Sequence, residues 1–576
     1  MNEYQISATT ASKHFIDIEY KVDTQEKEEI IFNLPAWRPG RYELANYAQN
    51  IQYWKAFDEN RKRLPSKKLS KDSWYVKTGG AKAVTVKYNY YAFQLDAGAS
   101  YFDENQLYVN PVNCLLYINE NINDPCSLKL NIPATYKIAS GLDFSDDNVA
   151  IAADYHTLAD SPFIASADLV HKDYFVGEYK FNIWIQGLCK PDWDRILKAF
   201  ADFSKAQIDM FGKLPVKEYH FLFQVPSHKF YHGVEHLNST MICLGPGYKL
   251  MENGTYTEFL GISSHELFHS WNIKSIRPIE MHPYDYSKEN YSNLGYVAEG
   301  VTTYYGDLML LRSGGYSWDT FSVEFSKFIT RHFHNYGRDY QTLAESSFDT
   351  WLDGYKQGAP DRKVSMYVKG SIIALMKDIQ LRKTTSNTKS LDDVMRSLYY
   401  DFALQNRGYS EDDYLGLMYG SAEKFDKTFF DNFVWGLTPI DEYLFESVDY
   451  LGCELKLKRT NDVLEDLFGA KVFKNEVGHQ AINQIAPGSP AEIASLSIND
   501  ELVAVNSLKI EDNLNDLMKF NKDGNVDLTV FRNKSLLHIT LMPGKETYFP
   551  NYSLIKKQNA TEEQKINFRL WAKQEW

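Results

Sequence analysis

The sequence predicts a multidomain α+β protein, and three observations lead to this fold class. The chain has 576 residues, more than one hydrophobic core usually serves. Hydrophobic residues make up 44% of it and aromatic residues 15%, values typical of a folded chain rich in strands. Apolar residues alternate with period two near the start, follow helical periodicity in the middle, and form short strand-like runs near the end. We therefore expect three principal domains and a C-terminal tail.

Residues 1–170 are expected to form an antiparallel β domain of sandwich type. Apolar and polar side chains alternate in residues 15–20 and again in residues 84–91, as in strands with one buried face. Turn-forming pairs such as Pro39-Gly40 and Gly79-Gly80 separate the runs. Short strands between regular turns favour two packed sheets.

Residues 171–450 are expected to form a domain that begins as mixed α and β structure and becomes helical. Helical periodicity first appears in residues 193–210, and a strand pair follows at 220–225 and 235–244. Four further stretches then have helical periodicity: 256–274, 294–312, 364–382 and 391–402. A mixed core that opens into a helical subdomain is the expected arrangement.

Residues 455–545 are expected to form a small C-terminal β domain. Short strand-like runs surround the turn Gly488-Ser489-Pro490-Ala491, and another run begins near Asp500. Residues 546–576 carry no motif and are expected to be a tail.

Charge and cysteine usage exclude several classes of function. The net charge is −14 and no long basic run occurs, which argues against a nucleic-acid surface. The five cysteines lack metal-binding or disulfide spacing, and a reducing compartment fits them best. No apolar run is long enough to span a membrane, and the start lacks a secretion signal. We expect no membrane partner and a soluble, cytoplasmic chain as given; removal of a signal would leave the same sequence, so the compartment is unknown.

The segment His265-Glu266-Leu267-Phe268-His269 lies within a predicted helix. Histidines four residues apart project from one helical face, so His265 and His269 can bind a single ion. Glu266 then points towards the open position of that ion, where a general base is needed. The motif therefore predicts two nitrogen ligands and a base at a metal site.

A third ligand must come from another helix, because catalytic zinc keeps three protein ligands and one position for water. Glu299 lies in an apolar setting within the predicted helix 294–312 and is the expected third ligand. Glu289 is closer to His269 in sequence, but its polar surroundings indicate a loop, and we reject it as a ligand. Asp307, two turns beyond Glu299, is a candidate for orienting the histidines.

The stretch from His265 to Pro278, HELFHSWNIKSIRP, and the stretch from Ala298 to Tyr305, AEGVTTYY, closely resemble the glycyl aminopeptidase family of gluzincin zinc metallopeptidases. The segment from Leu34 to Tyr42, LPAWRPGRY, resembles the N-terminal β domain of that family. This resemblance implies a thermolysin-like catalytic domain for residues 171–450 and a PDZ-like domain for residues 455–545. The closest match to the carboxylate-binding loop of a PDZ domain is Phe468-Gly469-Ala470. Docking of this domain against the catalytic domain is as good an interpretation as ligand binding.

The resemblance also implies roles for three further residues. Gly233 and Glu235 correspond to an edge strand that binds substrate, on which the glutamate holds the free amine. Tyr367 corresponds to a tyrosine that stabilises the transition state. Both roles are chemically sensible, since a carboxylate pairs with an ammonium group and a phenol can donate a hydrogen bond to an oxyanion.

Together these observations predict a zinc aminopeptidase with one Zn²⁺ ion held by His265, His269 and Glu299. Water activated by Glu266 would attack the peptide bond, and Tyr367 would assist. The resemblance implies glycine and alanine as preferred N-terminal residues. Two alternatives stay open. One is a zinc endopeptidase with the same site. The other is a PDZ-bearing scaffold that binds peptide C-termini and whose peptidase site is vestigial.

Overall fold

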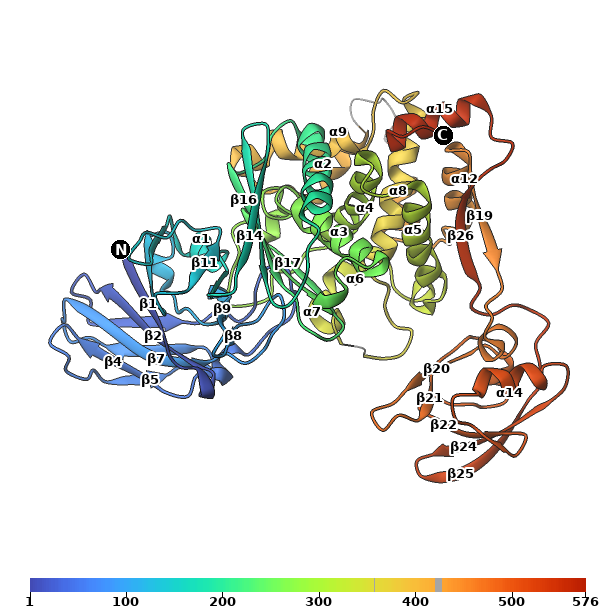
Figure 1. The fold of residues 1–576 in the computed structure, drawn as a ribbon, viewed down its shortest axis with the longest axis horizontal. Helices are drawn as coiled ribbons and strands as arrows, with labels where there is room; N and C mark the ends of the chain where they lie inside the picture. Colours follow the sequence, from blue (N-terminus) through green and yellow to red (C-terminus); the bar gives the residue numbers. More distant parts are fainter. Residues whose placement is uncertain (357, 420–426) are drawn as a thin grey trace.

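The computed structural model describes residues 1–356, 358–419 and 427–576. It has the multidomain α+β architecture that the sequence predicts. Figure 1 shows a β-rich N-terminal domain in blue, a central region in green and yellow in which a sheet is followed by helices, and a C-terminal β domain in orange. No helix within these ranges is both long and apolar enough to cross a membrane.

The N-terminal domain contains three sheets. Their orders are β12-β10-β1-β2-β7-β4, β11-β13-β9-β8 and β3-β6-β5. The strands are β1 (Asn2–Thr10), β2 (Phe15–Asp23), β3 (Glu29–Asn33), β4 (Trp54–Asp58), β5 (Ser66–Lys68), β6 (Ser73–Lys77), β7 (Ala83–Tyr91), β8 (Tyr101–Phe102), β9 (Gln106–Val109), β10 (Cys126–Asn131), β11 (Lys137–Ser140), β12 (Val149–Ala152) and β13 (Phe163–Ser166), and the short helix α1 is Tyr155–Ala159.

The N-terminal domain departs in one place from the predicted antiparallel arrangement. Strand β2 alternates between buried and partly exposed residues, as its sequence pattern predicts, and it pairs antiparallel with β1 and β7. Strand β1, however, pairs in parallel with β10. Parallel neighbours need a long crossover connection, and most of the domain lies between these two strands, so no local pattern could reveal the pairing.

The central region begins with a five-stranded sheet of order β14-β15-β16-β18-β17. Its strands are β14 (Val170–Val176), β15 (Tyr179–Gln186), β16 (Glu218–Gln224), β17 (Phe230–Glu235) and β18 (Ser239–Gly245). Strands β15, β16 and β18 are parallel, whereas β17 is antiparallel to β18 and forms one edge of the sheet. The free side of β17 can therefore pair with an extended chain.

Helices follow the sheet. They are α2 (Trp193–Phe211), α3 (Asn253–Phe268), α4 (Thr302–Ser313), α5 (Trp318–Phe333), α6 (Leu343–Phe348), α7 (Thr350–Asp353), α8 (Val368–Thr384), α9 (Leu391–Asp401), α10 (Glu411–Tyr419), α11 (Thr428–Phe433) and α12 (Asp441–Tyr450). The predicted helices 193–210 and 391–402 are confirmed to within a residue or two at each end. The other helices differ at their ends: α3 stops before residue 274, α8 starts after residue 364, and a π-helical turn, Tyr296–Val301, precedes α4.

The C-terminal β domain has its own hydrophobic core, separate from the continuous core that joins the N-terminal and central regions. Its sheet has the order β20-β21-β22-β24-β25, with β23 beside β22. The elements are β20 (Ala470–Lys474), β21 (Gln480–Ile485), α13 (Pro490–Ile493), β22 (Glu501–Val505), β23 (Leu508–Lys509), α14 (Leu514–Phe520), β24 (Val526–Arg532) and β25 (Ser535–Leu541).

Residues 546–576 return to the central region instead of forming the expected tail. Strand β26 (Asn551–Lys556) pairs antiparallel with β19 (Cys453–Lys458), the strand by which the chain leaves that region. Helix α15 (Glu562–Ala572) then packs on the helical layer, at the upper right of Figure 1. The C-terminal β domain is thus an insertion between two paired strands.

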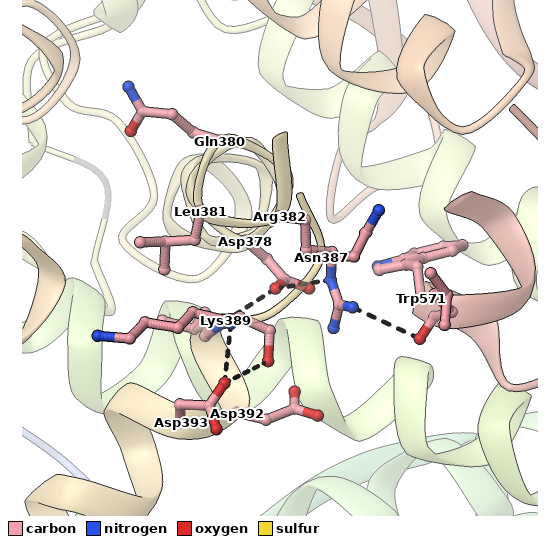
Figure 2. Close-up of polar contacts among 12 residues, drawn as sticks. Asp378, Gln380, Leu381, Arg382, Asn387, Lys389, Asp392, Asp393 and Trp571 are labelled. Carbon is pink, nitrogen blue, oxygen red and sulfur yellow. Dashed lines mark hydrogen bonds and ion pairs between the residues drawn. The ribbon is translucent and has the colours of Figure 1, made fainter. Parts of the chain in front are cut away.

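Buried polar contacts anchor α15. Figure 2 shows Asp378 and Arg382 of α8 between α9 and Trp571 of α15. The Trp571 indole donates a 2.7 Å hydrogen bond to the Tyr304 hydroxyl, which donates at 2.6 Å to Asp378. Arg312 of α4 donates to the backbone carbonyl of Trp571 at 2.9 Å. The last helix is therefore held by the same helices that support the candidate site.

Candidate metal centre

The structure brings three of the predicted ligands together. The Nε2 atoms of His265 and His269 lie 3.0 Å apart, and Glu299 Oε2 is 3.4 Å from His269 Nε2 and 4.0 Å from His265 Nε2. Nitrogen ligands about 2.0–2.1 Å from a tetrahedral zinc ion would lie roughly 3.4 Å apart. The donor set and its spacing therefore fit one zinc ion.

His269 is held in the form that binds metal. Its Nδ1 lies 2.9 Å from the carbonyl oxygen of Asn272. A carbonyl oxygen can only accept, so Nδ1 carries a proton and Nε2 is the ring atom that faces the ligand cluster. This backbone contact, just beyond the end of α3, orients the ring as metal ligands require.

Asn272 also connects α3 to the element that carries Glu299. Its Nδ2 donates to the carbonyls of Val297 and Ala298, at 2.8 and 3.1 Å, and to Thr302 Oγ1 at 2.9 Å. A side chain that takes up helix carbonyls favours a widened turn, and Glu299 lies within the π-helical turn at this place. The early end of α3 therefore brings Asn272 against the turn that carries Glu299.

The electrostatics of the cluster favour a cation. Burial is the largest effect on each group, and it lowers the pKa of His265 well below its usual value and raises that of Glu299. Burial also lowers the pKa of His269, but Glu299, Glu235 and Glu266 outweigh it and raise that pKa to about 10. Buried carboxylates thus stabilise positive charge at this point, as a divalent metal would supply.

Glu266 lies against the edge strand β17. Its side chain is 5% exposed, and no group in the described parts of the chain hydrogen-bonds to its Oε2 atom. A Cβ atom at Gly233 would lie 2.1 Å from Glu266 Oε1, so only glycine leaves room for the carboxylate here. Burial raises the pKa of Glu266 well above its usual value, as suits a group that accepts and returns a proton.

Glu235 is buried beside the same cluster. Oxygen atoms of Glu235 and Glu266 and a ring nitrogen of His269 all lie within 4.8 Å of one another. Within the described ranges Glu235 Oε1 has no hydrogen-bond partner. Gly40 from the N-terminal domain closes over this carboxylate, since a Cβ atom there would lie 2.4 Å from Glu235 Oε2. Gly40 also has a φ of 81°, which favours glycine.

The segment around Gly40 reaches the ligands themselves. The Tyr42 hydroxyl donates a 3.3 Å hydrogen bond to Glu299 Oε1, and Tyr42 packs edge-on against Trp351. Trp37 donates to the carbonyl of Asp285 at 2.7 Å. The N-terminal domain therefore forms one wall of the site, a contribution the sequence does not reveal because these contacts span more than 240 residues.

Tyr367 is half-buried at the start of α8 and lines the cleft that His265 and Glu266 also line. Burial and the nearby Glu299 raise its pKa well above the usual value, so its phenol keeps its proton. Gly300 and Gly370 let α8 approach the π-helical turn, because a Cβ atom at Gly300 would lie 2.6 Å from Gly370 Cα. The positions of Tyr367 and Glu299 are thereby linked.

Asp307 does not orient the histidines in this structure. Among the described residues no hydrogen bond joins its carboxylate to His265 or His269, and it lines the cleft instead. The backbone carbonyl of Asn272 orients His269 instead. The sequence did not indicate this residue, although it lies within the motif around His269.

Comparison with protein families gives two matches. Residues 3–167 match the Peptidase M61 N-terminal domain, and residues 258–373 match the M61 glycyl aminopeptidase domain. The second match contains His265, Glu266, His269, Glu299 and Tyr367. No curated protein sequence matches the chain.

Solved structures similar to the chain include an aminopeptidase N family protein from Idiomarina loihiensis. It is 25% identical, with a TM-score of 0.90 over 99% of this chain and 100% of that one. An M1 zinc metallopeptidase from Deinococcus radiodurans, bound to a Tyr-Ser-Ala substrate, is 13% identical, with a TM-score of 0.46 over 74% of this chain and 92% of that one.

Proposed function

Since the chain carries the N-terminal and catalytic domains of the M61 glycyl aminopeptidase family, we propose that it is a zinc-dependent aminopeptidase that removes glycine or alanine from peptide N-termini. One observation carries the proposal. A buried carboxylate without a partner in the described chain, that of Glu235, lies in one cluster with Glu266 and His269. A free α-ammonium group fits such a carboxylate.

His265, His269 and Glu299 would hold one zinc ion, because two imidazoles and a carboxylate at this spacing are a common hydrolase ligand set. When bound, zinc lowers the pKa of a coordinated water to about 7 and polarises the carbonyl of the substrate. Tyr42 and Asn272 keep the ligands oriented from either side of the cluster.

Two side chains would handle protons during the reaction. Glu266 takes a proton from the attacking water and returns it to the leaving amine, and its buried setting suits both steps. Tyr367 keeps its proton and donates a hydrogen bond to the oxyanion that develops on the substrate.

The wall formed by the N-terminal domain supports exopeptidase action over endopeptidase action. Gly40 packs against Glu235, and Tyr42 against Glu299, so the N-terminal domain closes the site behind the proposed amine position. An endopeptidase needs room for residues on both sides of the scissile bond. We therefore expect the closed side to admit a single residue, and the family likeness to glycyl aminopeptidases favours a small one.

The proposal is tested with glycyl, alanyl and leucyl p-nitroanilides and their N-acetylated forms. We expect the zinc-loaded enzyme to cleave the free-amine glycyl and alanyl substrates fastest and the acetylated forms not at all. Glu266→Gln should lower kcat by at least about 100-fold while zinc stays bound. Glu252→Gln, an exposed residue at the start of the same helix, is the matched control and should behave as wild type.

Cleavage of the acetylated substrates would replace the aminopeptidase proposal with an endopeptidase. Full activity after complete zinc removal, checked by metal analysis, would rule out the metal mechanism. Protein that holds zinc but cleaves no substrate in a broad peptide library would favour the scaffold alternative.

We also propose that residues 455–545 form a PDZ-like domain that binds peptide C-termini. Gly469, with a φ of 71°, directly precedes β20, which lies at the edge of its sheet. An edge strand after a glycine loop is suited to adding a peptide strand and capturing its carboxylate. Fluorescence anisotropy should detect binding of peptides with free C-termini, and equal binding of amidated peptides would contradict the proposal.

A further inference from the structure

A cleft of about 560 Å³ begins beside the metal ligands and extends away from Glu235. His265, Glu266 and Tyr367 line its inner end, and neither Glu235 nor Glu299 lines it. The cleft continues between β17 and helices α3, α4 and α5, where Tyr231, Tyr316 and Asp307 form its walls. A substrate that enters the cleft must occupy this continuation.

The edge strand gives the substrate a direction, if the proposed function holds. Tyr231, Gly233 and Glu235 are alternate residues of β17 and so point to the same face, about 6.5–7 Å apart. Glu235 marks the amine end, and Gly233 lies under Glu266, where the bond is cut. The residue that follows the scissile bond therefore lies beside Tyr231, in the continuation of the cleft.

Asp307 is the unusual group in this place. It is 9% exposed, and none of the described residues hydrogen-bonds to its carboxylate. A Cβ atom at Gly261, one helical turn before His265, would lie 3.9 Å from Asp307 Oδ1, which locates the carboxylate close to the inner end of the cleft. Burial and the nearby Glu324 raise its pKa to about 7. Its oxygen atoms are not sealed off from the cleft, so a ligand there can pair with them.

The surrounding charges compensate this carboxylate only in part, because Glu324 raises its pKa while Lys327 lowers it. Lys327 is engaged by Glu324, with both oxygens 2.7 Å from its Nζ atom. Glu258 adds a further negative charge to the lining, and Arg331 adds a positive one. A cationic ligand group would therefore gain from Asp307 without displacing an existing ion pair.

The two tyrosines suit the stem of a long basic side chain. Tyr231 is 56% exposed and lines the cleft, so it can cover the stem, while Tyr316 is 4% exposed and forms a fixed wall, held by a 2.8 Å hydrogen bond from its hydroxyl to the Thr257 carbonyl. Aromatic faces accept the alkyl stem of lysine and the plane of an arginine guanidinium.

We propose that Tyr231, Tyr316 and Asp307 form a subsite that selects a basic residue immediately after the scissile bond. The substrates are then peptides whose small first residue is followed by lysine or arginine. This inference rests on the proposed aminopeptidase activity and adds to it a specificity that Asp307 determines.

The test compares four peptides, Ala-Xaa-Ala-Ala, in which Xaa is lysine, arginine, norleucine or glutamate. Norleucine matches the lysine stem without its charge. We expect kcat/KM for lysine and for arginine to exceed that for norleucine at least about tenfold, with glutamate lowest, as one charged contact implies. In Asp307→Asn the ratio of lysine to norleucine should fall below about threefold. In Asp319→Asn, an exposed residue of α5 outside the cleft, it should stay at the wild-type value.

Wild-type enzyme that cleaves lysine and norleucine peptides equally would overturn the subsite but leave the aminopeptidase intact. A lysine preference that survives in Asp307→Asn would overturn the role of Asp307. If zinc-loaded wild type cleaved none of the four, the proposed function itself would fail, and this inference with it. Because the lysine–norleucine comparison needs only wild type, it holds even if Asp307→Asn does not fold.

Discussion

Gly233 lies where β17 passes under Glu266, and its missing side chain is what lets the carboxylate approach the strand. We predict that Gly233→Ala lowers kcat at least about 100-fold, because Cβ displaces Glu266 from the proton-transfer position. Zinc content, measured by mass spectrometry, should stay at one ion per chain, since the ligands lie elsewhere.

The control for this change is Gly254→Ala, at a glycine near the start of α3 with open space around its missing Cβ atom. It should retain wild-type kcat. Equal kcat in Gly233→Ala and wild type would show that Glu266 is not held against β17 in solution.

Tyr42 is a second residue whose effect can be isolated. The substitution Tyr42→Phe removes only the hydroxyl that donates to Glu299. We predict about tenfold weaker zinc binding in competition with a chromophoric chelator, as is typical when the partner of a metal ligand is removed. Tyr136→Phe, which removes a hydroxyl bonded to the exposed Glu104 carbonyl, is the matched control. Equal affinity in Tyr42→Phe and wild type would contradict the orienting role.

The candidate site divides into a part that the sequence predicts and a part that it does not. The spacing of His265 and His269 is local, because any helix places residues four apart on one face. The hydrogen bond from Tyr42 to Glu299 joins residues 257 positions apart, and the approach of Gly40 to Glu235 depends on how two domains pack. Single-sequence patterns contain no information about such packing.

Among the elements, the loop after α1 forms a buried clamp between the N-terminal and catalytic domains. Asp160 accepts from Lys274 at 2.7 Å, from the His236 ring at 3.0 Å and from the Leu237 backbone at 2.9 Å. Lys274 is 4% exposed, so removal of the carboxylate leaves a buried cation unpaired. We predict that Asp160→Asn lowers stability by about 3 kcal/mol at pH 7, measured by thermal and denaturant unfolding.

The clamp also predicts a pH dependence. Burial raises the pKa of Asp160, but Lys274 and His236 outweigh burial and hold it well below the usual value. A carboxyl group with a lowered folded pKa stabilises the fold above its unfolded pKa of about 3.9 and loses this contribution as pH falls through the folded value. The stability difference between wild type and Asp160→Asn should therefore be constant above about pH 5 and shrink below about pH 4. A difference that grew on acidification would contradict the clamp.

The elements themselves were predicted best where periodicity is long and local. Helix α2 follows from the apolar spacing of residues 193–210. The predicted helix 256–274 is too long, because Asn272 leaves the helix to bind the carbonyls of Val297 and Ala298. The predicted helix 294–312 contains the π-helical turn for the same reason. In both places a tertiary contact overrides a pattern that would otherwise continue.

At the scale of the whole molecule, the C-terminal β domain is carried on a stem of two strands. β19 and β26 pair from Cys453 with Lys556 to Lys458 with Asn551. We predict that a chain in which a two-residue Asn-Gly turn replaces residues 459–550 still folds its catalytic region and binds one zinc ion, since the turn closes the ladder as a hairpin. Circular dichroism, thermal unfolding and metal analysis test this. An aggregated or metal-free product would show that the inserted domain is part of the catalytic fold.

Some contacts would be lost in that chain. Lys471 Nζ lies 2.8 Å from His334 Nδ1, and Gln484 donates to the His334 carbonyl and to Asp361. These contacts hold the inserted domain beside the segment that leads to Tyr367. A lower kcat with unchanged zinc affinity would therefore mean that the inserted domain supports this segment.

The anchoring of α15 has a consequence for biosynthesis. Trp571 is fully buried against α4, the helix that continues from the turn with Glu299, yet it is translated after nearly every other residue described. While α15 is still inside the ribosomal exit tunnel, α4 lacks the partner that covers this face. The N-terminal domain can fold early during translation, whereas the face of α4 is covered only after Trp571 has been made. Folding of the helical layer should thus trail that of the N-terminal domain, because its buried partner comes from a segment more than 260 residues further along the chain.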